Sequence, residues 1–130
     1  IPVALTGGEL FTSLQSGAID ATEWVGPYND LAFGLHKAAD YYYYSGWHEP
    51  GAALEFTVNK QAYEALPEDL QAIIEVATRA VNQDMLDEYT ARNNAALLAL
   101  QASSEVDVRP LPDDVLRALH RASNEYLEEV

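Results

Sequence analysis

The sequence contains no cysteine and few basic residues, and each shortage excludes a class of chemistry. Without cysteine the chain can form no disulfide, use no thiolate nucleophile and build no zinc–thiolate site. Seven Lys and Arg residues stand against 21 Asp and Glu residues, which gives a formal net charge of −14. Because such a surface repels phosphate backbones and anionic membranes, no nucleic acid is expected among its partners.

Long hydrophobic runs and leader sequences are also missing. No stretch approaches the roughly 20 apolar residues that span a bilayer. The sequence does not contain a basic segment followed by an apolar one, which is the pattern of a signal peptide. The 130-residue chain begins at Ile1, and its only methionine is Met85. It begins inside a strand-like segment and ends inside a helix-like one, so we interpret it as a fragment, which would lack such targeting segments.

Signatures of catalysis are absent as well. The sequence contains no nucleophile elbow, phosphate loop or dinucleotide fingerprint. The three histidines, His36, His48 and His120, have no metal-ligand spacing. His36 and His120 fall in amphipathic helical segments, where a solvated or hydrogen-bonded histidine is the usual finding. The sequence therefore offers no support for an enzymatic activity.

Cap and turn residues place the helices expected in the first half of the chain. Thr6 and Glu9 fit a capping box, which predicts a helix that continues until Gly17 ends it. This interpretation of the glycine-rich start is favoured over an anion-binding loop. Pro27 suits the first position of a second helix, which the apolar spacing extends to about Ala39.

Strand-like segments alternate with these helices, which predicts an α/β fold class. They cover residues 1–5, 18–25, 40–47 and 52–58, and the third contains the four consecutive tyrosines 41–44. Four aromatic residues in a row are typical of a strand that is covered on both faces. Core packing is therefore expected for most of them, with a ligand cleft as the alternative.

The second half is predicted to be mainly helical. Asn59 caps a short helix that ends before Pro67. Residues 67–104 repeat apolar side chains at close to the helical period, which predicts one helix of about 36 residues, roughly 54 Å long. We expect a helix of that length to bridge two bodies or to pack against a partner. A short strand at 106–111 and an amphipathic helix over 113–130 follow.

Two acidic residues differ from the rest because each follows a predicted strand and precedes a turn. Glu23 stands beside Trp24 before a Gly-Pro pair, and Glu49 follows Trp47 before a Pro-Gly pair. Ligand-binding residues of α/β sheets gather at the carboxyl ends of strands. Two acids there suit a cation with oxygen ligands, such as sodium or calcium. The alternative is that both acids cap neighbouring helices or pair with a base.

Two stretches carry a resemblance to a known family. The first, GGELFTSLQSGAIDATEW, resembles the glycine–helix–ALQ-x-G-x-x-D segment in solute-binding subunits of tripartite ATP-independent periplasmic (TRAP) transporters, with Ser13-Leu14-Gln15 in place of Ala-Leu-Gln. Its continuation, VGPYNDLAFGLHKAADYYYYSGWHEPG, is similar to the branch that binds 2-oxo acids and related monocarboxylates. The long helix from Pro67 fits this family too, since its members have a helix that crosses both lobes.

The resemblance implies a fragment of a two-lobe periplasmic-binding-protein-like fold with one long lobe-spanning helix. Such proteins close two α/β lobes on a small carboxylate and deliver it to membrane permease subunits. Residues 1–130 would be the C-terminal part, mostly the second lobe plus the long helix, without the first lobe and the extreme C-terminus. Exposed strand edges and apolar surface would then favour self-association, including a homodimer.

The resemblance also implies roles for individual residues. A metal ion would lie beside the ligand, with Glu23 as a side-chain ligand and Trp24 as a backbone-carbonyl ligand or cleft wall. Glu49 would face the same cleft. The arginine that clamps the substrate and a glutamine metal ligand belong to segments before Ile1, so none of the arginines here takes that role. The rival hypothesis is a non-catalytic helical interaction or structural module without a small-molecule ligand.

Overall fold

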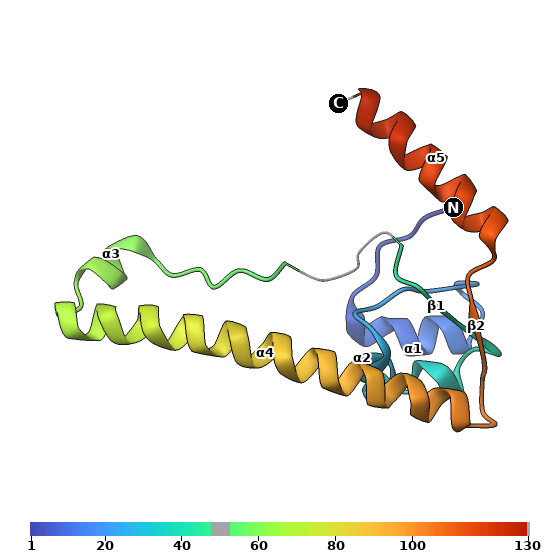
Figure 1. The fold of residues 1–130 in the computed structure, drawn as a ribbon, viewed down its shortest axis with the longest axis horizontal. Helices are drawn as coiled ribbons and strands as arrows, with labels where there is room; N and C mark the ends of the chain where they lie inside the picture. Colours follow the sequence, from blue (N-terminus) through green and yellow to red (C-terminus); the bar gives the residue numbers. More distant parts are fainter. Residues whose placement is uncertain (48–52, 130) are drawn as a thin grey trace.

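The computed structural model describes residues 1–47 and 53–129 (Figure 1). Most of the ordered structure is helical, and a small parallel sheet joins two distant segments. In chain order the elements are α1 (Gly7–Gln15), α2 (Pro27–Phe33), the 3-10 helix η1 (Leu35–Lys37), β1 (Tyr41–Tyr44), α3 (Lys60–Glu64), α4 (Glu68–Ala102), β2 (Asp107–Pro110) and α5 (Asp113–Glu129). None of the helices in the described part is long and apolar enough to cross a membrane.

Helix α1 begins and ends as the sequence predicts. The Glu9 carboxylate accepts hydrogen bonds from the Thr6 N–H at 3.1 Å and from the Thr6 hydroxyl at 2.7 Å. At the other end Gly17 adopts a φ of 73°, and the Ala18 N–H donates to the Ser13 carbonyl at 2.9 Å. This is a Schellman motif, which a glycine in the left-handed region makes favourable. The capping prediction is confirmed.

The helix predicted from Pro27 to Ala39 is divided into two pieces. Pro27 does occupy the start of α2. However, Gly34 adopts a φ of 71°, which ends α2, and the chain continues as the short helix η1. Glycine has no Cβ that would oppose this left-handed conformation, so the helical spacing of apolar residues did not prevent the break.

The sheet contains fewer strands than the sequence pattern predicts. β1 pairs with β2 in parallel, with Tyr41 opposite Asp107 and Tyr44 opposite Pro110. Within the described residues the segments 1–5, 18–25 and 53–58 are irregular, although their composition is strand-like. A strand exists only when a neighbour satisfies its backbone N–H and C=O groups. The part of the chain described here provides no such neighbour for these three segments.

The core lies at one end of the molecule. Its buried apolar residues come from the first helix, the 3-10 helix, the long helix and the position just before the last strand: Leu10, Leu35, Ala96, Leu100 and Val106. Figure 1 shows α1, α2 and the sheet gathered around the C-terminal end of α4. Leu100 is fully buried there, so this end of α4 anchors the packed body.

The predicted long helix is confirmed, because α4 runs for 35 residues, or about 52 Å. Its N-terminal half projects from the packed body together with α3 (Figure 1). Asn59 caps α3 as expected, its Oδ1 accepting from the Ala62 N–H at 3.0 Å. α3 is attached to α4 through the Tyr63 hydroxyl, which donates to the Glu75 carboxylate at 3.1 Å. Large apolar side chains stay exposed on this half of α4 and on α5.

Candidate functional site

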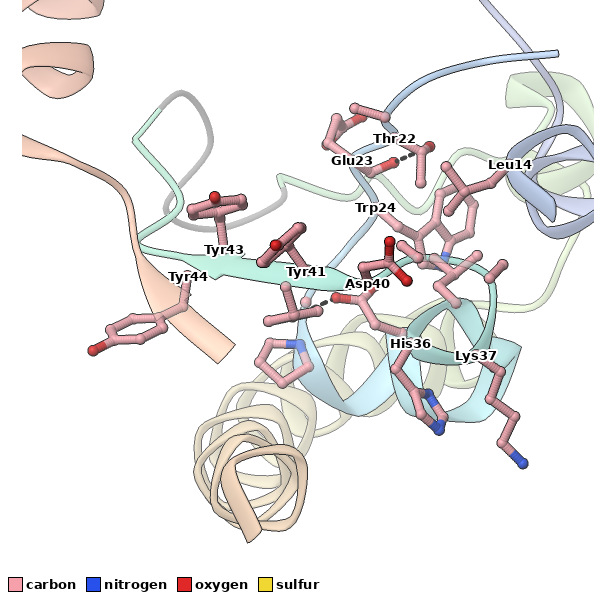
Figure 2. Close-up of a pocket in the computed structure, with 18 of the residues that line it drawn as sticks. Leu14, Thr22, Glu23, Trp24, His36, Lys37, Asp40, Tyr41, Tyr43 and Tyr44 are labelled. Atoms are coloured by element: carbon pink, nitrogen blue, oxygen red, sulfur yellow. Dashed lines mark hydrogen bonds between the residues drawn. The ribbon is translucent and has the colours of Figure 1, made fainter. Parts of the chain in front are cut away.

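A cleft of about 1160 Å³ opens in the packed body (Figure 2). Residues 19–27 form one wall, and residues 35–46, which include η1 and β1, form another. Leu97 of α4 and Glu105 add to its lining. The cleft therefore joins the irregular segment before α2 to the parallel sheet, and both contain residues singled out from the sequence.

Glu23 and Trp24 lie together on the first wall. Figure 2 shows both side chains on the segment before α2, and the Thr22 hydroxyl donates to the Glu23 carbonyl at 3.2 Å. The Glu23 side chain is exposed. Both predicted residues therefore line one cleft. The third predicted residue, Glu49, and the turn at 48–51 lie outside the described residues.

The tyrosines of β1 line the cleft more than they fill a core. Tyr41 is 50% exposed and Tyr43 is 47% exposed, whereas the alternate Tyr42 and Tyr44 are half-buried. Figure 2 shows Tyr41 and Tyr43 on one side of the strand and Tyr44 on the other. All four are cleft residues. The expectation of core packing for most of them is wrong, because only one face of β1 packs closely in this structure.

The Trp24 side chain is wedged between two helices. Its ring lies 5.3 Å from the Phe33 ring, centroid to centroid. A β-carbon built on Gly7 would lie only 2.7 Å from Trp24 Cη2, so the start of α1 touches the indole directly. The indole Nε1 is buried, with no hydrogen-bond partner among the described residues. The ring therefore holds this part of the wall between α1 and α2.

Asp30 is a buried acid that the sequence did not single out. Its side chain is only 7% exposed, and the Tyr42 hydroxyl donates to its Oδ2 at 2.6 Å. Burial raises the pKa of Asp30, the bonds from Tyr42 and the Gly26 backbone oppose that rise, and the charge of Glu23 adds to it. An acid in the first turn of a predicted helix resembles an ordinary solvated one. Its contact with β1 depends on tertiary packing that no local pattern reveals.

The start of α2 is held by a residue of the long helix. The Asn93 side-chain oxygen accepts from the Tyr28 N–H at 3.0 Å. The residue at the N-cap position, Gly26, has no side chain to do so and adopts a φ of 155°. A β-carbon on Gly26 would lie 3.1 Å from the Asn93 oxygen. The close approach of α4 thus replaces a local cap.

His36 is a buried histidine beside an acidic side chain. It is 7% exposed, and its Nε2 lies 3.5 Å from the Glu105 carboxylate. Both residues line the cleft. The residues described include no group of three or more His, Cys, Asp or Glu side chains arranged to hold a metal ion.

Two solved structures share this fold. A TRAP periplasmic solute-binding protein from Pseudoalteromonas atlantica, with bound sodium and pyruvate, is 44% identical and superposes with a TM-score of 0.88 over 98% of this chain and 39% of that one. A TRAP transporter solute-binding protein from Bordetella bronchiseptica, a mixed-occupancy dimer with calcium and picolinate at its active site, is 40% identical with the same TM-score, over 98% of this chain and 38% of that one.

Sequence comparison finds relatives of the same kind as the two solved structures. A monocarboxylate 2-oxoacid-binding periplasmic protein from Nostoc sp. is 45% identical over 125 residues, which cover 96% of this chain and 34% of the relative. The profile of the bacterial extracellular solute-binding proteins of family 7, known as DctP, matches residues 1–130. The chain belongs to this family, and it spans little more than a third of the length of the relatives it matches. The predicted fold class, part of a TRAP solute-binding protein with its long helix, is confirmed.

Proposed function

We propose that the full-length protein containing this chain is the periplasmic solute-binding subunit of a TRAP transporter. It captures a small 2-oxo or hydroxy monocarboxylate together with a metal ion and performs no reaction on it. The observation that carries this proposal is the placement of Glu23 and Trp24 on one cleft wall, in a chain 44% identical to a protein that holds sodium and pyruvate.

The donors in the cleft fit a hard cation. Glu23 would contribute its carboxylate, Trp24 its backbone carbonyl and Glu49 a second carboxylate, all of them oxygens of the kind that calcium and sodium accept. The bound ion supplies positive charge beside the ligand. That charge offsets the repulsion which a protein of net charge −14 exerts on an organic anion.

The remaining roles follow from membership of the family. Residues 1–130 would form mostly the second lobe and the long helix 67–104, with the first lobe contributed by another part of the protein. The loaded protein would deliver its carboxylate to membrane permease subunits from the periplasm. A homodimer is consistent with the exposed apolar residues of α4 and α5, and the Bordetella relative is described as a dimer.

A ligand-binding panel on the full-length protein tests this function. Thermal unfolding is followed with pyruvate, longer 2-oxo acids, lactate and dicarboxylates, each with sodium, calcium or a chelator. A ligand at 100 times its dissociation constant adds about 2.7 kcal/mol of stability. We expect a cation-dependent shift with monocarboxylates alone. The rival, a helical interaction module, predicts no shift with any acid.

Glu23→Gln sharpens the test, because it removes one charge and keeps the volume of the side chain. We expect it to abolish the ligand-dependent shift, measured against the melting temperature of the same variant without ligand. Glu125→Gln, an equally conservative change on α5, is the matched control and should leave the shift intact. Loss of stability without any effect on the shift would give Glu23 a structural role only.

A further inference from the structure

We propose that Asp30 is a positioning residue for the binding site: with Tyr42 it ties the segment Glu23–Gly26 to strand β1 and so fixes the donors of Glu23 and Trp24. This inference rests on the proposed function, because it concerns the same site. It adds a residue that neither touches the cation nor belongs to the predicted ligand set.

The contacts of Asp30 connect the helix after the donor segment to the opposite wall of the cleft. Its carboxylate accepts from the Tyr42 hydroxyl of β1 at 2.6 Å, and its backbone N–H donates to the Gly26 carbonyl at 2.9 Å. Gly26 ends the segment that carries Glu23 and Trp24, and all of these residues line one cleft. Asp30, which lies in α2, therefore links the donor segment, through the start of α2, to β1.

Fold stability alone explains this carboxylate poorly. Asp30 is 7% exposed, and its Oδ1 is buried without a hydrogen-bond partner among the described residues. Burying a charge whose hydrogen bonds are incomplete costs free energy that a neutral side chain of the same size would avoid. The hydrogen bond that the carboxylate does accept comes from Tyr42 of β1. It serves the geometry of this wall by holding α2 against β1.

The start of α2 is also held by a second contact. Asn93 of α4 accepts from the Tyr28 N–H at 3.0 Å, just beyond Gly26. With that contact intact, loss of the Asp30–Tyr42 link would free the donor segment from β1 and leave α2 attached to α4. The expected consequence is a weaker cation site within an otherwise folded cleft. Residues that orient metal ligands in this way typically contribute about 10- to 100-fold in metal affinity.

The experiment measures the apparent pyruvate affinity of the full-length protein by calorimetry over a series of buffered calcium concentrations. Asp30→Asn removes the charge and weakens the hydrogen bond from the Tyr42 hydroxyl, because an amide oxygen is a poorer acceptor than a carboxylate. We expect the calcium concentration that gives half of the maximal pyruvate affinity to rise at least about tenfold. At saturating calcium the pyruvate affinity should return to that of the wild type. Tyr42→Phe removes the same link from the other side and should act in the same direction.

Asp84→Asn is the matched control, because Asp84 is an exposed acid on α4, outside the cleft. It should leave the calcium dependence close to that of the wild type. An equal loss in Asp84→Asn would assign the effect to general negative charge and overturn the inference. Unchanged calcium dependence in both Asp30→Asn and Tyr42→Phe would also overturn it. A wild-type protein that binds no monocarboxylate with either sodium or calcium overturns the proposed function, and this inference with it.

Discussion

Gly7 and Trp24 approach so closely that a β-carbon on the glycine would lie 2.7 Å from Cη2 of the indole. The first residue of α1 thus supports the wall that carries the proposed cation donors. Its neighbour Gly8 has nothing within 4 Å of the corresponding position. The two adjacent glycines therefore differ in their surroundings. A side chain at Gly7 would collide with Trp24, whereas one at Gly8 would meet open space.

This difference gives the first prediction. Gly7→Ala would push the indole away from Phe33, and we expect it to lower the free energy of unfolding by about 1–3 kcal/mol, as overpacking does. Gly8→Ala adds a methyl group in open space and should leave stability unchanged or raise it by up to about 1 kcal/mol. Urea unfolding of both variants measures the difference. Equal free energies of unfolding in the two variants would show that the Trp24 ring can move aside without destabilising the protein.

The second prediction concerns the cap that α4 supplies to α2. Asn93→Ala removes the acceptor for the Tyr28 N–H and should lower the free energy of unfolding by about 1 kcal/mol, the usual value for a lost cap. Asn94→Ala makes the same change of helix propensity at an exposed neighbour. The difference between the two variants in urea unfolding isolates the cap. A difference near zero would mean that water accepts the hydrogen bond of the Tyr28 N–H as well as Asn93 does.

The third prediction is a pH dependence. Because burial raises the pKa of Asp30, the native state binds this proton more tightly than the unfolded state, whose value is about 3.9. The free energy of unfolding should therefore fall as pH rises from about 4 through the raised pKa, and then level off. Urea unfolding at several pH values should show this decline in the wild type and its loss in Asp30→Asn.

The variant Tyr42→Phe tests whether Asp30 is the group that causes this pH dependence. The Tyr42 hydroxyl stabilises the charged form of Asp30, so it lowers the pKa that burial raises. Its removal should extend the decline in stability to higher pH. A shift of the decline to lower pH, or a decline that persists unchanged in Asp30→Asn, would assign the effect to another group.

Local chemistry accounts for what the sequence predicted well. The Thr6–Glu9 capping box, the Gly17 stop, the Asn59 cap and the long helix depend on residues close in the chain. The resemblance at residues 7–51 predicted the family. These features need no knowledge of the distant parts of the fold.

Features that depend on distant contacts were beyond the sequence pattern. The strand-like segments 1–5 and 18–25 are irregular because strand formation requires a neighbour. Asp30 is connected to the cleft wall by its hydrogen bond with Tyr42 of β1. Asn93 reaches the start of α2 because α4 packs against α2. The assignment of Glu23 and Trp24 as metal ligands stays a prediction, with both placed on one cleft wall.

The use of Asn93 as a cap has a consequence for the order of folding. α2 has seven residues, fewer than an isolated helix needs for stability in water. The side chain that completes its start follows 65 residues later in the sequence. During synthesis from the N-terminus, the Glu23–Gly26 segment therefore leaves the ribosome well before the residue that fixes it. The proposed cation site would therefore be completed late, when α4 docks on α2.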